Sequence, residues 1–236
     1  MANKISSIFH QRISPRLLIT TGAFVCLLSS VFSEHSLASA NHSDINSPVV
    51  ENIGYCADSN IIQKWKLLIE RHKNSNIVTQ LKETNNFFNR EIHYSSDVEI
   101  YHESDLWATP VETMMKGEGD CEDFSIAKFR TLRLMGVDES KLRLTYVRAH
   151  YGRSSISEAH MVLSYYDGQE SDPLILDNLS LAIHLGSERT DLEPVFSFNT
   201  ENLWKENQLT EINPIDRMGQ WRMMGERLSN QEGLCI

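Results

Sequence analysis

The sequence predicts an α+β domain in which a helical N-terminal lobe packs on an antiparallel sheet. Three observations support this prediction. Apolar residues recur at helical spacing through much of 61–135. From residue 142 onward they alternate as they do in strands. The helices also precede the strands instead of alternating with them, which is typical of α+β folds. The chain shows no internal repeat and no low-complexity tract.

Residues 1–40 have the pattern of a secretory signal peptide. Basic residues precede a mostly apolar run at 17–32, and Ala38-Ser39-Ala40 is a small-residue cleavage pattern. The alternative is a single membrane anchor, but polar residues interrupt the run, which is short for a span of ~20 apolar residues. We therefore expect cleavage after Ala40, which leaves one domain over 41–236 that does not span a membrane.

Charge and length narrow the classes of function. The chain of 236 residues carries a formal net charge of −10 at pH 7. This acidity argues against a nucleic-acid partner, which requires a basic face. It is compatible with bound calcium or with a basic protein partner. The length provides for one compact core.

Three cysteines remain once the leader is removed: Cys56, Cys121 and Cys235. An odd number in an exported chain indicates a thiol left over from disulfide pairing. Cys56 and Cys235 lie near the two ends and could pair, which would leave Cys121 free. Two unpaired cysteines are equally compatible with the sequence.

Three helices are expected before the central one. Amphipathic patterns predict the first two at 61–73 and 77–89, and 93–101 is less regular. The third is a short helix that begins at Thr109, with Pro110 in its first turn. Glu112 stands at the position that completes a capping box.

The central helix begins within the segment 117–124, which reads Gly-Glu-Gly-Asp-Cys-Glu-Asp-Phe. Apolar residues recur at helical spacing as far as Met135, and Gly136 caps the end. Cys121 should therefore lie in the first turn, where free N–H groups and the positive dipole end favour a thiolate. Cys121 is either a reactive thiol or a buried structural cysteine.

The period changes after the central helix. Segments 142–147 and 159–166 alternate as strands, the turn signal Asp167-Gly168 follows, and 173–177 is a third strand. The remaining expectations are an irregular stretch or further strand at 190–198 and a closing helix at 215–228.

His160 and Asp177 supply what a thiol nucleophile needs, a base and a group that orients the base. His160 lies on an otherwise apolar strand, where it is either satisfied in the core or presented at a site. Asp177 ends the next strand, where a buried carboxylate is costly without a partner. The alternative for Asp177 is a turn residue that bonds Leu179.

Four segments resemble the bacterial transglutaminase-like cysteine proteinases of the LapG type. They are 107–112, 117–128, 159–163 and 172–179. The resemblance extends from about residue 55 to about residue 204 and implies a papain-like, transglutaminase-like fold. It implies Cys121 as the nucleophile, His160 as the general base and acid, and Asp177 as the orienting group.

The resemblance further implies a periplasmic protease that requires calcium. Its substrate would be a large cell-surface adhesin, cut in the N-terminal region at a small-residue (di-alanine) site, which promotes biofilm dispersal. An inner-membrane receptor for cyclic di-GMP would hold it inactive. Two alternatives stay open: a transglutaminase that uses the same triad for acyl transfer to an amine, and a non-catalytic binding module on this scaffold.

The acids beside Cys121 present a physical difficulty, because negative charge raises the pKa of a thiol. Asp120 has a simpler role as the helix N-cap, and Glu122 and Asp123 as first-turn acids that the helix dipole favours. Calcium held by oxygen atoms of Asp120, Glu122 and Asp123 would offset their charge. No EF-hand spacing is present, so charge and resemblance suggest this site, not a motif.

Overall fold

The structure is a computed structural model that describes residues 59–150, 157–168 and 171–235. The predicted signal peptide at 1–40 and Cys56 lie outside these residues, as does the side chain of Cys235. Signal cleavage and the pairing of Cys56 with Cys235 therefore stay predictions. No helix within the described ranges is long and apolar enough to cross a membrane.

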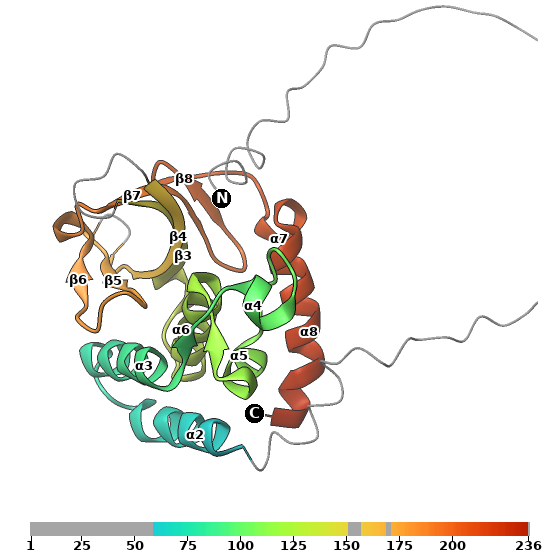
Figure 1. Ribbon diagram of the computed structural model, residues 1–236. Helices are drawn as coiled ribbons and strands as arrows, with labels where there is room; N and C mark the ends of the chain where they lie inside the picture. Colours follow the sequence, from blue (N-terminus) through green and yellow to red (C-terminus); the bar gives the residue numbers. More distant parts are fainter. Residues whose placement is uncertain (1–58, 151–156, 169–170, 236) are drawn as a thin grey trace, which may run out of the picture.

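Seven of the described strands form one antiparallel sheet in the order β6-β5-β4-β3-β7-β8-β9 (Figure 1). The strands are β3 (Leu142–His150), β4 (Ser157–Tyr165), β5 (Leu174–Leu176), β6 (His184–Leu185), β7 (Leu192–Phe198), β8 (Leu203–Lys205) and β9 (Gln208–Leu209). The antiparallel sheet predicted to follow the helices is confirmed. Of the two alternatives for 190–198, the structure shows the further strand.

The helices gather on one side of this sheet, with α6 between the strands and α3 (Figure 1). They are α2 (Asn60–His72), α3 (Ile77–Glu91), α4 (Asp97–Tyr101), α5 (Pro110–Lys116), α6 (Cys121–Leu134), α7 (Pro214–Arg217) and α8 (Gly219–Cys235). Two short strands, β1 (His93–Tyr94) and β2 (Glu118–Gly119), form a separate parallel pair. β2 directly precedes α6 in the chain. The predicted order of helices before the main sheet is confirmed.

Local sequence signals account for the ends of α5 and α6. The Thr109 hydroxyl accepts a hydrogen bond from the Glu112 N–H at 3.2 Å, and the Glu112 carboxylate accepts one from the Thr109 N–H at 2.8 Å. This is the predicted capping box. Gly117 follows α5 with a φ of 70°, and Gly136 follows α6 with a φ of 87°. Both adopt the left-handed conformation that glycine tolerates at helix ends.

Three details differ from the expectations. The helix expected at 215–228 is two helices, because the extended backbone of Met218 separates α7 from α8. The β8–β9 hairpin turns at Glu206 and Asn207, whose φ values of 51° and 61° arise without the glycine that signals such turns. The less regular stretch at 93–101 contains α4, which begins with a capping box formed by Ser96 and Glu99.

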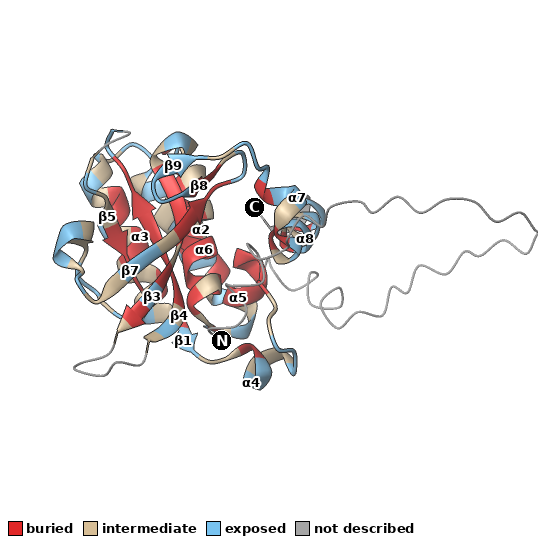
Figure 2. Ribbon diagram, turned by 90° about the horizontal axis from the view of Figure 1, so that it is seen from above, coloured by how far each residue is buried: buried red, intermediate tan, exposed pale blue. Residues whose placement is uncertain are grey.

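The main core lies between α6 and the sheet. Figure 2 shows α6 and the central strands β3 and β4 as mainly buried. Its larger buried members include Phe129, Leu132, Leu142, Leu144, Met161, Leu163, Phe198 and Trp221. The buried side chains of α6 and β4 pack together and fix the position of this helix, which carries Cys121 at its N-terminus.

Truncation of this core should weaken the fold. Leu144 is fully buried, at 0% exposure, so Leu144→Ala should lower the free energy of unfolding by about 2–5 kcal/mol. Leu209 is 62% exposed, so Leu209→Ala should stay within ~0.5 kcal/mol of the wild type. Urea unfolding measures both values. Similar losses in the two variants would contradict this assignment of the core.

Candidate active site

Cys121 is the first residue of α6, and Asp120 caps the helix by accepting a hydrogen bond from the Glu122 N–H. The thiol is a free cysteine, 8% exposed. It donates a hydrogen bond to the Glu122 carboxylate, with 2.7 Å between Sγ and Oε2. Burial raises the pKa of the Cys121 thiol well above its ordinary value, and the charges of Glu122 and Asp120 add to this.

The backbone of Met161 on β4 holds the start of α6. Its N–H hydrogen-bonds the Cys121 sulfur and lowers the thiol pKa, while its carbonyl accepts a hydrogen bond from Ser125 Oγ at 3.1 Å. β5 pairs with β4 only from Leu163 to Tyr165, so this edge of β4 is unpaired at Met161 within the sheet described above. The helix start satisfies backbone groups that a longer β5 would have bonded.

His160 immediately precedes Met161, and its side chain meets Asp177 at the end of β5. His160 Nε2 lies 2.8 Å from Asp177 Oδ1, with the histidine side chain 5% exposed and the aspartate fully buried. Burial alone would raise the pKa of Asp177, but the hydrogen bond and charge of His160 outweigh it. The Leu179 N–H and Arg189 also contribute, so this pKa falls below its ordinary value.

Both interpretations of Asp177 are true at once. The Leu179 N–H donates to Asp177 Oδ1 at 3.1 Å, which is the turn contact. The same oxygen bonds His160, so the turn residue is also the buried partner of the histidine. Asn89 on α3 fixes the backbone here, because its side-chain N–H donates to the Asp177 carbonyl at 2.7 Å. The imidazole and the carboxylate are thus paired, and the histidine immediately precedes the residue whose backbone contacts the Cys121 thiol.

Arg189 contacts Asp177, and the sequence did not predict this contact. Its Nη2 lies 2.8 Å from Asp177 Oδ2, opposite the oxygen that His160 uses. Arg189 follows a short 3-10 turn, η3 (Gly186–Glu188), and belongs to no motif. Only the folding of the 177–191 segment brings it to Asp177, so no local pattern could have identified it.

The predicted metal ligands form two overlapping groups of acidic side chains. Asp120 lies with Cys121 and Glu122 in one group, and with Asp123 and Asp97 in the other. In each group the candidate ligand atoms all lie within 4.8 Å of one another. Asp97, the first residue of α4, was not predicted, because its place beside Asp120 depends on the path of the chain between helices.

The carboxylates of this cluster repel one another. Burial raises the pKa of Asp120 to about 10, with further increases from Glu122, Asp123 and Asp97. Burial likewise raises the pKa of Asp123 well above its ordinary value, although the Ala108 N–H donates to its carboxylate at 2.8 Å. Carboxylate oxygens gathered in this way are the donors that calcium prefers, so the residues present fit a hard cation.

Gly119 permits this crowding. A Cβ built on it would lie 2.9 Å from the Asp123 Cβ and 3.1 Å from Thr113 Cγ2. These contacts are too short for any side chain without movement of α6 or α5. The glycine before Asp120-Cys121 therefore lets the turn approach the first turn of α6.

Lys128 is an unusual neighbour of the histidine–aspartate pair. It lies two turns along α6 from Cys121, is 0% exposed, and its Nζ has no hydrogen-bond partner among the described residues. Burial lowers its pKa to about 7, opposed by the charge of Asp177. The ammonium lies 5.6 Å from the centre of the Phe124 ring, a contact that offsets part of the desolvation.

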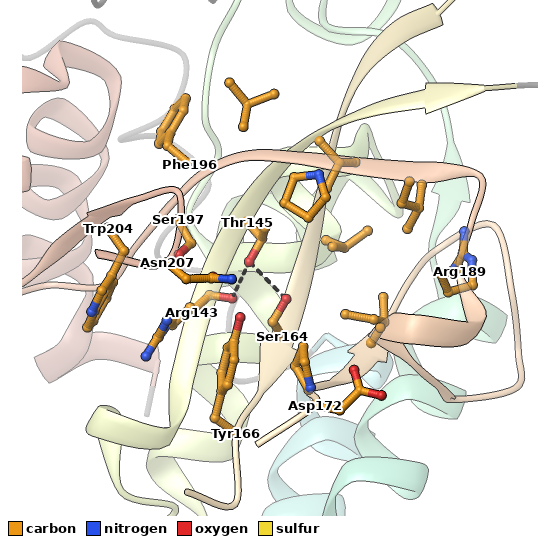
Figure 3. A pocket seen from close by; sticks show the side chains of 18 of the residues that line it. Arg143, Thr145, Ser164, Tyr166, Asp172, Arg189, Phe196, Ser197, Trp204 and Asn207 are labelled. Carbon is orange, nitrogen blue, oxygen red and sulfur yellow. Dashed lines mark hydrogen bonds between the residues drawn. The ribbon is translucent and has the colours of Figure 1, made fainter. Parts of the chain in front are cut away.

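A cavity lies on the sheet face opposite α6. It measures about 840 Å³, and Arg143, Tyr166 and Trp204 cluster at one end of it (Figure 3). The Arg143 guanidinium lies 4.1 Å from the ring centres of both aromatic residues. Of the residues discussed above, Arg189 lines this cavity, while Cys121, His160 and Asp177 do not.

The buried lysine gives a test of these electrostatics. Its folded pKa of about 7 lies below the unfolded value, so from pH 7 to 10 the unfolded chain binds more protons at this site. Stability due to Lys128 should therefore rise with pH across this window. Lys128→Met should raise the free energy of unfolding at pH 7 and reduce its rise with pH.

Urea unfolding of both proteins at pH 7 and 8.5 measures the effect. Lys64→Met, at a lysine whose side chain is 50% exposed, is the control and should leave the profile unchanged. A wild-type pH profile in the Lys128→Met protein would contradict this account of the buried lysine.

Comparison with known proteins identifies the family and several similar structures. Residues 43–204 match the family model described as "Bacterial transglutaminase-like cysteine proteinase BTLCP". A structure of Legionella pneumophila LapG is 38% identical, with a TM-score of 0.64 over 75% of this chain and 96% of that one.

Two further LapG structures from Legionella pneumophila match similarly. The calcium-bound form is 37% identical, with a TM-score of 0.64 over 75% of this chain and 98% of that one. The EGTA-treated form is 38% identical, with a TM-score of 0.65 over 75% and 96%. No protein with a curated description matches the chain. The chain is a cysteine protease that belongs to the bacterial transglutaminase-like cysteine proteinases.

Proposed function

We propose that the protein is a calcium-dependent periplasmic endopeptidase in which Cys121 is the nucleophile, His160 the general base and acid, and Asp177 the orienting group. The observation that carries this proposal is the buried pair of His160 Nε2 and Asp177 Oδ1 at 2.8 Å. The thiol of Cys121 lies against Met161, the residue next to this histidine.

The pair determines which nitrogen of His160 can react. An ionised Asp177 accepts at Oδ1, so His160 Nε2 carries a proton there and Nδ1 remains for the thiol. Nδ1 takes the proton of Cys121, and the thiolate attacks the peptide carbonyl. His160 then protonates the leaving amine, and water hydrolyses the acyl-enzyme. The backbone N–H of Cys121 at the helix start would hold the oxyanion.

The acidic cluster supports the calcium requirement. Asp120, Asp123, Glu122 and the newly identified Asp97 would hold the ion. A bound cation would supply positive charge that offsets Glu122 and Asp120, whose charges otherwise raise the pKa of the Cys121 thiol. The existence of calcium-bound and EGTA-treated forms of the Legionella LapG supports the same proposal.

Substrate, location and control follow from the family resemblance and the sequence. We assign as substrate the N-terminal region of a large cell-surface adhesin, whose cleavage releases it and promotes biofilm dispersal. The regulator would be an inner-membrane receptor for cyclic di-GMP. The leader-like residues 1–40 support export to the periplasm.

A transglutaminase would use the same three residues but transfer the acyl group to an amine instead of water. A substrate incubated with a lysine donor distinguishes the two, because only acyl transfer gives a cross-linked product. A non-catalytic binding module would leave the substrate uncut.

The triad assignment predicts distinct losses of cleavage. Cys121→Ala should abolish cutting of a recombinant N-terminal adhesin fragment from the same genome. His160→Ala should lower kcat by roughly 10²–10⁴, the usual contribution of positioned proton transfer. Gel electrophoresis over time measures both.

A matched control is available for the histidine. His184 on β6 has a side chain that is 43% exposed, and His184→Ala should cut at the wild-type rate. Full cleavage by the Cys121→Ala protein would contradict the proposed function.

The calcium proposal predicts a pH-dependent stabilisation. Without the ion, Asp120 has a folded pKa of about 10 against an ordinary value of 3.8. The folded state therefore binds more protons than the unfolded chain, and stability falls as pH rises between these values. At a hundred times its Kd, calcium should stabilise the folded state at pH 7.5 by about 2.7 kcal/mol and so raise the melting temperature. The increase should be smaller at pH 5.

Asp97→Asn separates repulsion from binding. It should raise the melting temperature without calcium, because one opposing charge is lost, and should shrink the shift that calcium produces. Differential scanning calorimetry in EGTA and in calcium measures both effects, with the exposed Asp138→Asn as the control. An unchanged calcium shift in Asp97→Asn would remove this residue from the site.

A further inference from the structure

Asp177 is held at both of its carboxylate oxygens. Oδ1 accepts from His160 Nε2 at 2.8 Å and from the Leu179 N–H at 3.1 Å. Oδ2 accepts from Arg189 Nη2 at 2.8 Å. The aspartate side chain is fully buried and the arginine side chain is 11% exposed, so this ion pair is almost completely shielded from water. Shielding makes each contact stronger than a surface pair would be.

Arg189 is itself fixed by a second carboxylate. Its Nε lies 2.9 Å from Asp191 Oδ1 and its Nη2 lies 2.8 Å from Asp191 Oδ2, which is a two-point contact. The Asp191 carbonyl accepts a hydrogen bond from the His150 N–H at the end of β3, at 2.8 Å. The guanidinium is therefore anchored to the central sheet, not carried on a free loop. A planar group held at two edges leaves the carboxylate of Asp177 little freedom to rotate.

From this geometry we infer that Arg189 is a positioning residue of the protease, which acts on His160 through Asp177. This inference rests on the proposed function of the triad. Arg189 fixes the plane of the Asp177 carboxylate, so that Oδ1 stays directed at His160 Nε2 and the imidazole keeps one orientation. Rotation of an unclamped carboxylate would let the imidazole turn away from the thiol, which costs rate in the chemical step and not in substrate binding.

The charge of Arg189 serves the same end. Asp177 must stay ionised to accept a strong hydrogen bond from the His160 Nε2–H, but burial at this position favours the neutral carboxylic acid. The Asp191 carboxylate keeps Arg189 from being an unbalanced buried cation. Removal of the guanidinium would leave Asp177 buried with fewer donors.

The first test measures kcat and KM for cleavage of the adhesin N-terminal fragment with calcium present. Arg189→Gln should lower kcat at least about tenfold with KM nearly unchanged, and Arg189→Lys should recover part of the loss because it restores the charge. Arg148→Gln is the matched control, since Arg148 pairs with Glu193 on β7 at the exposed surface. An Arg189→Gln protein with wild-type kcat would overturn the inference.

A double-variant cycle excludes a merely structural role. Asp177→Asn keeps an oxygen for His160, as in papain-like enzymes with a Cys-His-Asn triad, but turns an amide N–H toward the Arg189 guanidinium. Adding Arg189→Gln to Asp177→Asn supplies an acceptor for that N–H, so the second change should not lower kcat further and should raise it. Independent losses that multiply would contradict the inference.

Two controls keep the outcomes separate. Circular dichroism and the melting temperature establish that each variant is folded, and Arg189→Lys replaces Arg189→Gln if the latter unfolds. Cys121→Ala in the same assay tests the proposed function by itself. If Cys121→Ala is inactive and the Arg189 variants match the wild type, the protease assignment stands and only the role of Arg189 fails.

Discussion

The start of α6 is bonded to the backbone of one strand residue, and the site depends on that contact. Met161 offers its N–H to the Cys121 sulfur and its carbonyl to the Ser125 hydroxyl. These groups are available because β5 stops pairing with β4 at Leu163. A β5 longer by two residue pairs would reach Met161, occupy the same backbone groups and displace the helix. The short strand therefore creates the place where a thiol can lie beside the strand that carries a histidine.

The same location brings two opposing electrostatic demands into one turn. The helix start and the Met161 N–H favour a thiolate, whereas burial and the charges of Glu122 and Asp120 favour the neutral thiol. Burial is the largest of these effects, and without a cation the neutral form prevails. Asp97 adds a further carboxylate near Asp120. The acidic residues that oppose catalysis are also those suited to hold calcium, so activity and metal binding are physically coupled in our proposal.

Local signals were sufficient to predict the fold and part of the site. Thr109 with Glu112, and Asp120 before Cys121, are capping patterns that the structure reproduces. The strand that bears His160 was evident from its alternation. Such features depend on residues within a few positions of one another, which a sequence displays directly.

The missed features depend on distant segments. Asp97 reaches the acidic cluster from α4. The capping box of this helix with Glu99 was present in the sequence, in a stretch whose pattern was less regular. Arg189 reaches Asp177 across a turn with no motif. Lys128 was not singled out from the sequence, and the packing around α6 buries it completely. Tertiary packing decided each of these positions, and no single sequence encodes that packing in a local pattern.

The central claim is that the pair of His160 and Asp177 activates the Cys121 thiol. The most direct measurement is the rate of alkylation by iodoacetamide from pH 5 to 10 with calcium present, located by mass spectrometry of peptides. Our account predicts rapid alkylation of Cys121 near pH 6 that is lost in His160→Ala. A rate that rises only above about pH 8.5, as for an ordinary thiol, and that is the same in both proteins would contradict it.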